Sequence, residues 1–238
     1  MLTHLSANST ITTLRDPTVK SPFEANTTLG VLPFFHVYGL YVVLLSVLEG
    51  RRIITMNKFD LEEYLSTIQR YKIEKLALVP PIVQYLIKNP VVNQYDLSSV
   101  KEIGCGGAPI SEASIQTIRK KLKLKEVRQG YGLTESGYGV SLTPIGHTRP
   151  GSVGKLYPGL SAVVRDVRTG ENLGVYVEGE ICFKGDTLMK GYYANPKATQ
   201  TSFTSDGWLR TGDIGYYDND GYLYIVDRLK DVIKYKGY

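Results

Sequence analysis

Cysteine is scarce in this chain of 238 residues, which contains only Cys105 and Cys182. The two lie far apart and in no spacing typical of metal ligands, which argues against a disulfide framework. The pattern favours a reducing compartment. The glycosylation sequons that begin at Asn8 and Asn26 are therefore not expected to be used.

Long apolar runs are also missing. The longest, from Leu40 to Leu48, is interrupted by Ser46 and is far shorter than the roughly 20 residues that cross a bilayer as a helix. The opening residues MLTHLSANST lack the charged region and apolar run of a secretory signal. We therefore expect an intracellular protein with no integral membrane segment.

A large excess of charge is absent as well. The formal net charge is +5 with a pI of about 9.0, and the one dense basic patch is residues 119–125 (RKKLKLK). That spacing is typical of a solvated helix end, whereas a nucleic-acid interface usually presents a broader basic surface. We therefore expect no nucleic-acid partner.

Several widespread catalytic motifs do not occur. GSVGK at 151–155 resembles only the end of a P-loop, and the GxG at 130–132 is followed by Glu135 where the dinucleotide-binding fingerprint needs glycine. The sequence also lacks GxSxG, HExxH and a CxxC pair. Simple P-loop, Rossmann, serine-hydrolase and zinc chemistry are therefore disfavoured.

The first half of the chain contains an alternation of strand-like and helix-like segments. Expected strands cover 28–35, 51–56, 75–80, 100–105 and 126–132. Expected helices cover 38–48, 61–71 with Asp60 at its start, 82–88, and Ser111 to about Leu122. This alternation predicts an α/β fold with a mostly parallel sheet flanked by helices.

Beyond about residue 145, glycine and proline become frequent and short strands with hairpin signals follow, among them two strands around Asn219-Asp220-Gly221. This texture predicts a smaller, antiparallel, β-barrel-like subdomain. We divide the chain into an α/β subdomain at 1–145 and a β subdomain at 146–226. The family resemblance described below implies that residues 227–238 form a hinge and the first residues of a further domain.

Distinctive residues follow the expected parallel strands, at the sheet edge where open α/β proteins bind ligands. Gly106-Gly107 forms either a tight strand-to-helix turn or a surface that a flat ring can approach closely. Tyr131 is either a core residue or a stacking face for a heterocycle. His36 is either a satisfied core histidine or a polar contact near a reacting centre.

Acidic residues add further candidates. Thr134-Glu135 either belongs to a surface loop or offers a hydroxyl to phosphate and a carboxylate to Mg²⁺. Asp213, in the segment RTGD, either is a plain turn residue or accepts hydrogen bonds from a ribose diol. Asp227 and Arg228 form either a salt-bridged hinge or a nucleotide contact.

Taken together, these segments resemble the adenylate-forming (ANL) superfamily, and most closely its luciferase-like and 4-coumarate–CoA-ligase-like acyl-CoA synthetases. The matching segments occur in family order and cover nearly the whole chain. They are LPFFHVYGL (32–40), GCGGAPIS (104–111), QGYGLTES (129–136), PGSVGKLYPG (150–159), GEICFKG (179–185), MKGYYANPKATQ (189–200) and residues 206–238, which include GWLRTGD and VDRLKDVIKYKG.

The resemblance implies an ATP-dependent acid–thiol ligase. Such an enzyme activates a carboxylic acid with MgATP as an acyl adenylate and then transfers the acyl group to the thiol of CoA. The implied cofactors and small-molecule partners are therefore ATP, Mg²⁺, CoA and a carboxylic acid. The implied compartment is cytosolic or peroxisomal, and no feature of the sequence indicates an oligomeric state.

The resemblance also implies roles for single residues. The implied catalytic residues are His36, Thr134, Glu135 and Lys234, with Glu135 as the Mg²⁺ ligand. The implied nucleotide contacts are Gly106, Gly107, Ala108, Tyr131, Gly132, Thr134, Asp213, Ile225 and Arg228. The implied acyl pocket is formed by His36, Gly107, Tyr138 and Gly139. The implied hinge is Asp227, and the implied CoA side is Lys236 and Gly237.

The family's phosphate loop and its catalytic lysine are expected before Met1 and after Tyr238, respectively. On that ground we expect an internal fragment that is inactive or severely impaired by itself. Two alternatives stay open: a catalytically inactive remnant, and a luciferase-type monooxygenase acting through the same adenylate.

Overall fold

The computed structural model describes residues 1–23 and 25–229. Its first elements are α1 (His4–Arg15), β1 (Thr27–Gly30), α2 (Val37–Leu48), β2 (Arg52–Thr55), α3 (Leu61–Tyr71), β3 (Lys75–Leu78), α4 (Pro80–Lys88), η1 (Pro90–Gln94), β4 (Glu102–Cys105), α5 (Glu112–Leu122) and β5 (Glu126–Gly132). The remainder are η2 (Thr134–Ser136), β6 (Gly139–Leu142), β7 (Gly154–Leu156), β8 (Leu160–Arg165), β9 (Gly179–Gly185), α6 (Pro196–Ser202), β10 (Leu209–Tyr217) and β11 (Tyr222–Arg228).

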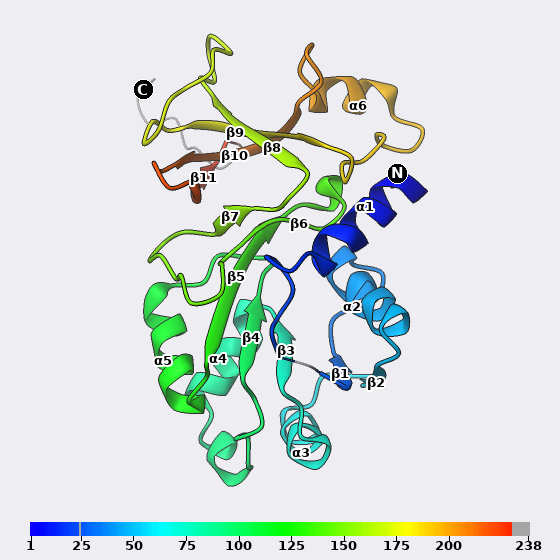
Figure 1. The fold of residues 1–238 in the computed structure, drawn as a ribbon, viewed down its shortest axis with the longest axis vertical. Helices are drawn as coiled ribbons and strands as arrows, with labels where there is room; N and C mark the ends of the chain where they lie inside the picture. The colour runs from blue at the N-terminus through cyan, green and yellow to red at the C-terminus, as the bar shows by residue number, and fades with distance from the viewer. Residues whose placement is uncertain (24, 230–238) are drawn as a thin grey trace.

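One long sheet connects the two halves of the chain. Its nine strands lie in the order β3-β4-β5-β6-β7-β11-β10-β9-β8, with parallel pairing from β3 to β5 and antiparallel pairing from β5 onward. In Figure 1 the antiparallel strands β8 to β11 lie above the parallel strands. The α/β fold class, with parallel strands flanked by helices and followed by antiparallel strands, is confirmed. β1 and β2 form a separate parallel pair, which the alternation of segments did not predict.

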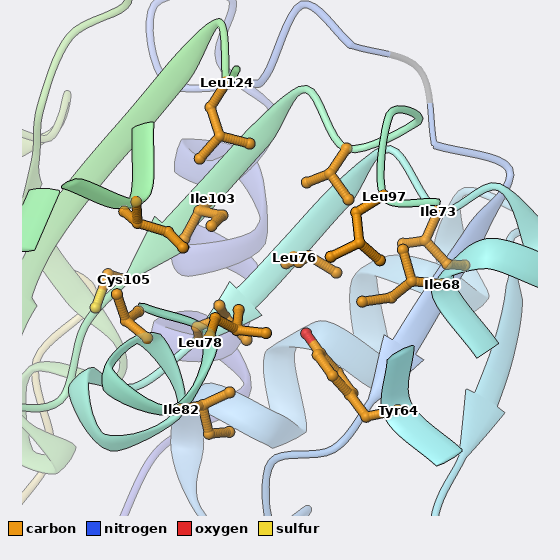
Figure 2. Close-up of a cluster of buried hydrophobic side chains, with 14 of the residues drawn as sticks. Tyr64, Ile68, Ile73, Leu76, Leu78, Ile82, Leu97, Ile103, Cys105 and Leu124 are labelled. Carbon is orange, nitrogen blue, oxygen red and sulfur yellow. The ribbon is translucent and has the colours of Figure 1, made fainter. Parts of the chain in front are cut away.

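The parallel strands bury an apolar face against helices. Leu76 and Leu78 of β3, Ile103 and Cys105 of β4, and Val127 of β5 alternate along their strands and are all buried. They join side chains of α3, α4 and α5 in one hydrophobic cluster (Figure 2). We call this side of β3, β4 and β5 the core face. Because successive strand residues point to opposite sides, the intervening residues form a second face.

The helix starts that the sequence predicts are confirmed for α3 and α5. The Asp60 carboxylate accepts a hydrogen bond from the Glu63 amide at 2.9 Å, and the Ser111 hydroxyl accepts one from Ser114. Such caps satisfy amides that have no partner within the helix. The expected strand at 28–35 is shorter than predicted and ends at Gly30. Pro33 has no amide hydrogen to extend the ladder.

Helix α1 has no counterpart in the sequence analysis. It begins at a capping box in which Thr3 and Ser6 exchange hydrogen bonds, and its buried positions are the polar residues Ser6, Thr10 and Thr13. The Thr10 hydroxyl donates a hydrogen bond to the Ser6 carbonyl oxygen. A buried stripe of hydroxyls carries no apolar periodicity, so a search for that periodicity misses the helix.

The antiparallel half has its own apolar cluster, which includes Val140, Ile181 and Phe183. The hairpin predicted around Asn219-Asp220-Gly221 joins β10 to β11, and Gly221 has a φ of 78° there. In the described ranges 1–23 and 25–229, no helix has the length and apolarity needed to cross a bilayer. The subdomain boundaries at 145 and 226 stay a prediction.

Candidate active site

A cavity of about 400 Å³ lies between α2 and the second face of β3, β4 and β5. Val37, Tyr38, Val42 and Leu45 of α2 form one wall. The opposite wall is formed by the strand residues that alternate in sequence with those of the core face. They are Lys75, Ala77, Glu102, Gly104, Arg128 and Gly130. We call this wall the cavity face. The cavity continues past the carboxyl ends of β4 and β5 to Arg228 of β11, so both halves of the chain contribute to it.

At that end the structure joins three of the implied nucleotide residues. The Tyr131 hydroxyl donates a hydrogen bond to Asp213 Oδ2 at 2.6 Å, and Arg228 Nε lies 3.0 Å from Asp213 Oδ1. The Asp213 carboxylate is almost fully buried. Burial, together with the adjacent Asp213 charge, raises the pKa of Tyr131 well above its usual range. Tyr131 therefore keeps its proton, which it donates to Asp213, and it lines the cavity.

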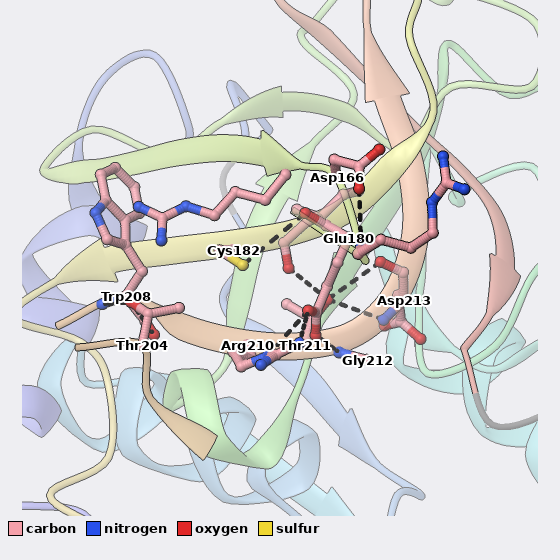
Figure 3. Close-up of polar contacts among 12 residues, drawn as sticks. Asp166, Glu180, Cys182, Thr204, Trp208, Arg210, Thr211, Gly212 and Asp213 are labelled. Carbon is pink, nitrogen blue, oxygen red and sulfur yellow. Dashed lines mark hydrogen bonds and ion pairs between the residues drawn. The ribbon is translucent and has the colours of Figure 1, made fainter. Parts of the chain in front are cut away.

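A bulge in β10 directs Asp213 toward Tyr131. The pairing of β10 with β9 breaks between Arg210 and Ile214, and bulges of this kind re-aim side chains. Within the bulge the Asp213 amide donates to the Thr211 hydroxyl at 3.0 Å. Glu180 of β9 accepts from Arg210 Nε at 2.9 Å and also from a backbone amide of the bulge (Figure 3). These hydrogen bonds therefore fix the RTGD segment at both of its ends.

The glycines of the site have identifiable backbone roles. Gly107 has a φ of 85°, a conformation that favours glycine. A Cβ on Gly132 would lie 2.2 Å from the Tyr138 carbonyl oxygen, so this glycine permits close packing of β5 against the following turn. Gly106 lines the cavity, and a Cβ there would lie 3.4 Å from the Gly130 carbonyl oxygen. Backbone conformation and close packing therefore explain why glycine occurs at positions 107 and 132, without any contribution from a ligand. Gly106, by contrast, leaves space in the cavity.

Glu135 is held by a tyrosine that the sequence analysis did not consider. It lies in η2, lines the cavity together with Thr134, and accepts a hydrogen bond at Oε1 from the Tyr192 hydroxyl at 2.6 Å. This bond is the largest cause of a raised Tyr192 pKa. Tyr192 is 57 residues away in sequence, so only the folded chain reveals the pair.

The described residues fit a magnesium ion that is shared with a nucleotide. No group of three or more His, Cys, Asp or Glu side chains suited to a metal occurs among residues 1–23 and 25–229. Mg²⁺ at phosphate-transfer sites is commonly bound by one or two carboxylates, with substrate oxygens and water completing the shell. Glu135, a partly buried carboxylate beside Thr134 in the cavity lining, matches that requirement.

His36 is not the core histidine that was one of its two interpretations. Its side chain is exposed, lines the cavity, and caps α2 by accepting a hydrogen bond at Nδ1 from the Tyr38 amide at 3.1 Å. An imidazole that accepts at Nδ1 carries its proton on Nε2. The cap therefore fixes both the position and the tautomer of a donor in the cavity lining.

Two further residues of the implied acyl pocket lie in the lining of the same cavity. Tyr138 and Gly139 both line the cavity, and the Tyr138 ring packs edge-on against Tyr38 and Tyr41 of α2, with ring centroids 5.8 and 5.3 Å apart. The Tyr38 hydroxyl donates to the Gly104 carbonyl at 3.0 Å. This aromatic group connects α2 to the sheet and narrows the space between them.

Some implied residues do not meet at this cavity. Ala108 is exposed in the loop after β4, and Ile225 packs with the second apolar cluster; neither lines the cavity. Asp227 is exposed near the end of β11 and accepts a hydrogen bond from the Arg228 amide. The implied residues Lys234, Lys236 and Gly237 lie outside the described residues.

The charged part of the cavity face was missed by the sequence analysis. Lys75, Glu102 and Arg128 lie on three neighbouring parallel strands and line the same cavity. Parallel strands covered on both faces are usually continuous apolar runs. The alternation of charged with apolar residues in KLAL, EIGC and EVRQ was therefore the available signal that one face borders a polar space.

Comparison with known proteins shows the family to which the chain belongs. A family model described as "AMP-binding enzyme" matches residues 1–193. The chain belongs to the AMP-binding enzyme family. The expected membership of the adenylate-forming superfamily is thereby confirmed.

Curated relatives of this AMP-binding family chain carry two kinds of name. A luciferin 4-monooxygenase from Photuris pensylvanica is 46% identical over 239 residues, which cover 100% of this chain and 44% of that protein. Probable 4-coumarate–CoA ligase 3 from Dictyostelium discoideum is 45% identical over 212 residues, covering 88% of this chain and 38% of that protein. The chain thus spans less than half the length of these relatives.

Solved structures show the same fold. ATP-bound MatB from Rhodopseudomonas palustris is 30% identical with a TM-score of 0.88, and the match covers 100% of this chain and 46% of that one. The luciferase-like enzyme from the nonluminescent mealworm Zophobas morio is 27% identical with a TM-score of 0.81, covering 94% of this chain and 52% of that one. The fold expected from the resemblance is the fold of these enzymes.

Proposed function

We propose that this chain carries the nucleotide- and acid-binding part of an AMP-forming acid–thiol ligase, an enzyme that activates a carboxylic acid as its adenylate and transfers the acyl group to CoA. The observation that carries the proposal is the 2.6 Å hydrogen bond between Tyr131 of β5 and Asp213 of β10, at the end of the 400 Å³ cavity. This bond brings an aromatic ring and a carboxylate from the two halves of the chain to one edge of the sheet, where α/β folds bind ligands.

The nucleotide end of the cavity suits adenosine monophosphate. Gly106 leaves backbone exposed for a flat base, and the Tyr131 ring offers a stacking face. Asp213 can accept both hydroxyls of a ribose once the bonds from Tyr131 and Arg228 rearrange, because a carboxylate has about four acceptor positions. We assign the ribose to Asp213 and Arg228, and the phosphate to Thr134.

The reacting carboxylate is assigned to the space between His36 and Glu135. ATP supplies the adenylyl group when bound, and Mg²⁺ offsets the charge of its phosphates. Glu135, oriented by Tyr192, would hold the metal. His36 would direct its Nε2 proton toward the acid, because its Nδ1 is occupied by the α2 cap. Such fixed donors stabilise charge that develops during transfer without reorganising.

The wider organisation follows from the same proposal. We assign residues 1–145 and 146–226 to two parts of the AMP-binding domain, and residues 227–238 to a hinge and the start of a further domain that would bring Lys234, Lys236 and Gly237 to the CoA side. Ala108 and Ile225 are assigned supporting positions around the nucleotide. An intracellular location, cytosolic or peroxisomal, belongs to the same proposal.

Binding of AMP to the chain tests the nucleotide site. We expect Asp213→Asn to weaken binding roughly tenfold to a hundredfold in equilibrium dialysis, as the loss of a charge-assisted hydrogen bond predicts. Asp206→Asn is the matched control, because Asp206 is an exposed carboxylate that pairs with an arginine, Arg165, and neither residue lines the cavity. Failure of the wild-type chain to bind AMP, or equal binding by Asp213→Asn, would contradict the proposal.

Catalysis is tested by pyrophosphate exchange with a panel of fatty and aromatic acids. We expect little exchange from the 238 residues alone and clear exchange from a longer protein that includes both flanking regions of the gene. Robust exchange by the 238 residues would refute the expectation that a phosphate loop and a catalytic lysine outside them are needed.

A luciferase-type monooxygenase is the second candidate, because a protein named luciferin 4-monooxygenase is 46% identical to the chain. It would use the same adenylate site and differ in the fate of the activated acid. The longer protein, supplied with luciferin, ATP and oxygen, distinguishes the two: light emission favours the monooxygenase, and acyl-CoA formation in the dark favours the ligase.

A further inference from the structure

The end of the cavity far from the nucleotide site is built from charged side chains. Lys75 and Glu102 are neighbours at the amino ends of β3 and β4, with Lys75 Nζ 3.5 Å from Glu102 Oε1. Arg128 NH1 lies 3.9 Å from the same oxygen. The Ser21 hydroxyl donates to Glu102 Oε2 at 2.5 Å. Glu102 and Arg128 are nearly inaccessible, each with a side-chain exposure of 2%.

A second charged group borders the same end of the cavity. Glu49, just after α2, pairs with Arg51 and lies 4.0 Å from Lys20. Both lysines and both arginines of these two groups line the cavity, as do the two glutamates. Four cationic side chains therefore face two anionic ones. Lys20 is half exposed, so the enclosed part of the cavity end holds three cations and two anions, an excess of one positive charge.

An excess of charge in a largely buried space is costly unless a counter-charge enters it. The cost is visible at Lys75, where burial lowers the pKa despite the nearby Glu102 carboxylate. Arg128 is already committed to carbonyl oxygens, donating from Nε to Thr143 and from NH1 to Val19 at 2.9 and 2.8 Å. Lys75, on a flexible stem and with part of its side chain accessible, is the cation best able to meet an incoming anion.

Between the two polar ends the cavity is apolar or small. Val42 and Leu45 of α2 face Ala77 and Gly104 of the sheet. Glu102, at the charged end, begins β4, and Gly106, at the nucleotide end, directly follows it. These four residue steps correspond to about 13 Å at the rise of an extended chain. A cavity made only for a fatty acid would remain apolar at this depth.

We propose that the acid substrate carries a second anionic group at the end opposite its reacting carboxylate, and that Lys75 binds this group. The substrate class is then an α,ω-dicarboxylic acid or a similarly extended acid with an anionic far end. The inference rests on the proposed function, because it takes the reacting carboxylate to lie near His36 and Glu135.

Direct binding of a matched pair of acids tests the inference in the chain as it is. We expect decanedioate to bind at least about tenfold more tightly than decanoate in isothermal titration at neutral pH, since a hydrogen bond to a charged group typically contributes this much. Lys75→Met keeps the length of the side chain and removes the charge. It is expected to abolish the preference, and Lys75→Arg is expected to retain it.

The matched control is Lys72→Met, because Lys72 pairs with Asp96 on the exposed surface and should leave the preference unchanged. Equal binding of the two acids by the wild-type chain, binding of neither, or an undiminished preference in Lys75→Met would each overturn the inference. If Lys75→Met does not fold, the relative affinities of the two acids for the wild-type chain and for Lys75→Arg still test the inference. No nucleotide is needed, so a chain that prefers decanedioate but binds no AMP would contradict the proposed function and leave the charged pocket supported.

Discussion

The two faces of β3, β4 and β5 are made by the same short segments and have opposite character. On the core face, Leu76, Ile103 and Cys105 are buried under helices α3, α4 and α5 (Figure 2). On the cavity face, Lys75 and Glu102 are followed by residues with small side chains or none. Period-two alternation assigns each residue to its face, since neighbours on a strand point to opposite sides.

The difference separates stability from binding. The core face gains stability from apolar area removed from water. The cavity face buries less apolar area, because Ala77, Gly104 and Gly130 leave space next to α2. It also places charged side chains where their desolvation costs free energy. The core face is thus expected to tolerate no polar change, while the cavity face is expected to respond to changes in the balance of its charges.

The largest effect is expected from Glu102→Gln on the cavity face. The substitution removes the carboxylate that lies between Lys75 and Arg128 and leaves a partly buried and a fully buried cation without their shared anion. Removing one partner of a buried ion pair typically costs about 3–5 kcal/mol. Urea unfolding should show this loss, whereas Glu62→Gln, on the exposed side of α3, should change stability little. A small effect of Glu102→Gln would mean that the cations do not depend on it.

Ile103→Ala tests the core face of the same strand. Ile103 is fully buried, and truncating a buried isoleucine to alanine typically costs about 2–5 kcal/mol through lost contacts and the cavity left behind. The control is Val47→Ala, because Val47 is 70% exposed on α2. The same urea titration measures both. Loss of stability without loss of acid binding in the folded fraction would show that the two faces act independently.

Alkaline pH should destabilise the protein through the core face. Burial raises the pKa of the Cys105 thiol from 9.0 to about 12, so above pH 9 the unfolded chain loses a proton that the folded chain keeps. Stability from this group is therefore complete below pH 9 and lost as the pH rises toward 12. The difference at pH 10 is about 1.4 kcal/mol, the value of one pKa unit. Cys105→Ala should remove this part of the pH dependence, and an unchanged slope would contradict it.

The smallest effect on stability is expected from Lys75→Met. Burial lowers the pKa of Lys75, so in the pH range below its ordinary value of 10.5 the unfolded chain binds more protons, and this residue makes stability rise with pH. Removing the ammonium group removes both a pairing with Glu102 and the cost of burying it, and these nearly cancel. We expect a change within about 1 kcal/mol at neutral pH and a flatter dependence of stability on pH. A loss as large as that of Glu102→Gln would show that the site is not cationic in excess.

Much of the fold could be predicted because it depends on local patterns. Asp60 and Ser111 mark the starts of α3 and α5 by side-chain caps that act over three residues. The hairpin at Asn219-Asp220-Gly221 is equally local. Helix α1 could not be predicted in this way, because its buried stripe consists of Ser6, Thr10 and Thr13.

The candidate site was predictable in part. Tyr131, Glu135 and Asp213 stood out because unusual residues follow strands and turns. Tyr192 did not stand out, because it meets Glu135 across 57 residues. Arg228 was named as a nucleotide contact, but its pairing with Asp213 across a bulged pair of strands was not predicted. These contacts depend on the order and register of strands that are distant in sequence, so no short segment predicts them.

The amino-acid sequence by itself determined where most strands and helices form, where several of them begin, and which residue types stand at the strand ends. Those properties arise from period, capping and turn chemistry, which act between near neighbours. Only the tertiary structure decided that Tyr131 meets Asp213 and that Lys75, Glu102 and Arg128 share one cavity. The reason is that strand order and register bring together residues that no local interaction connects.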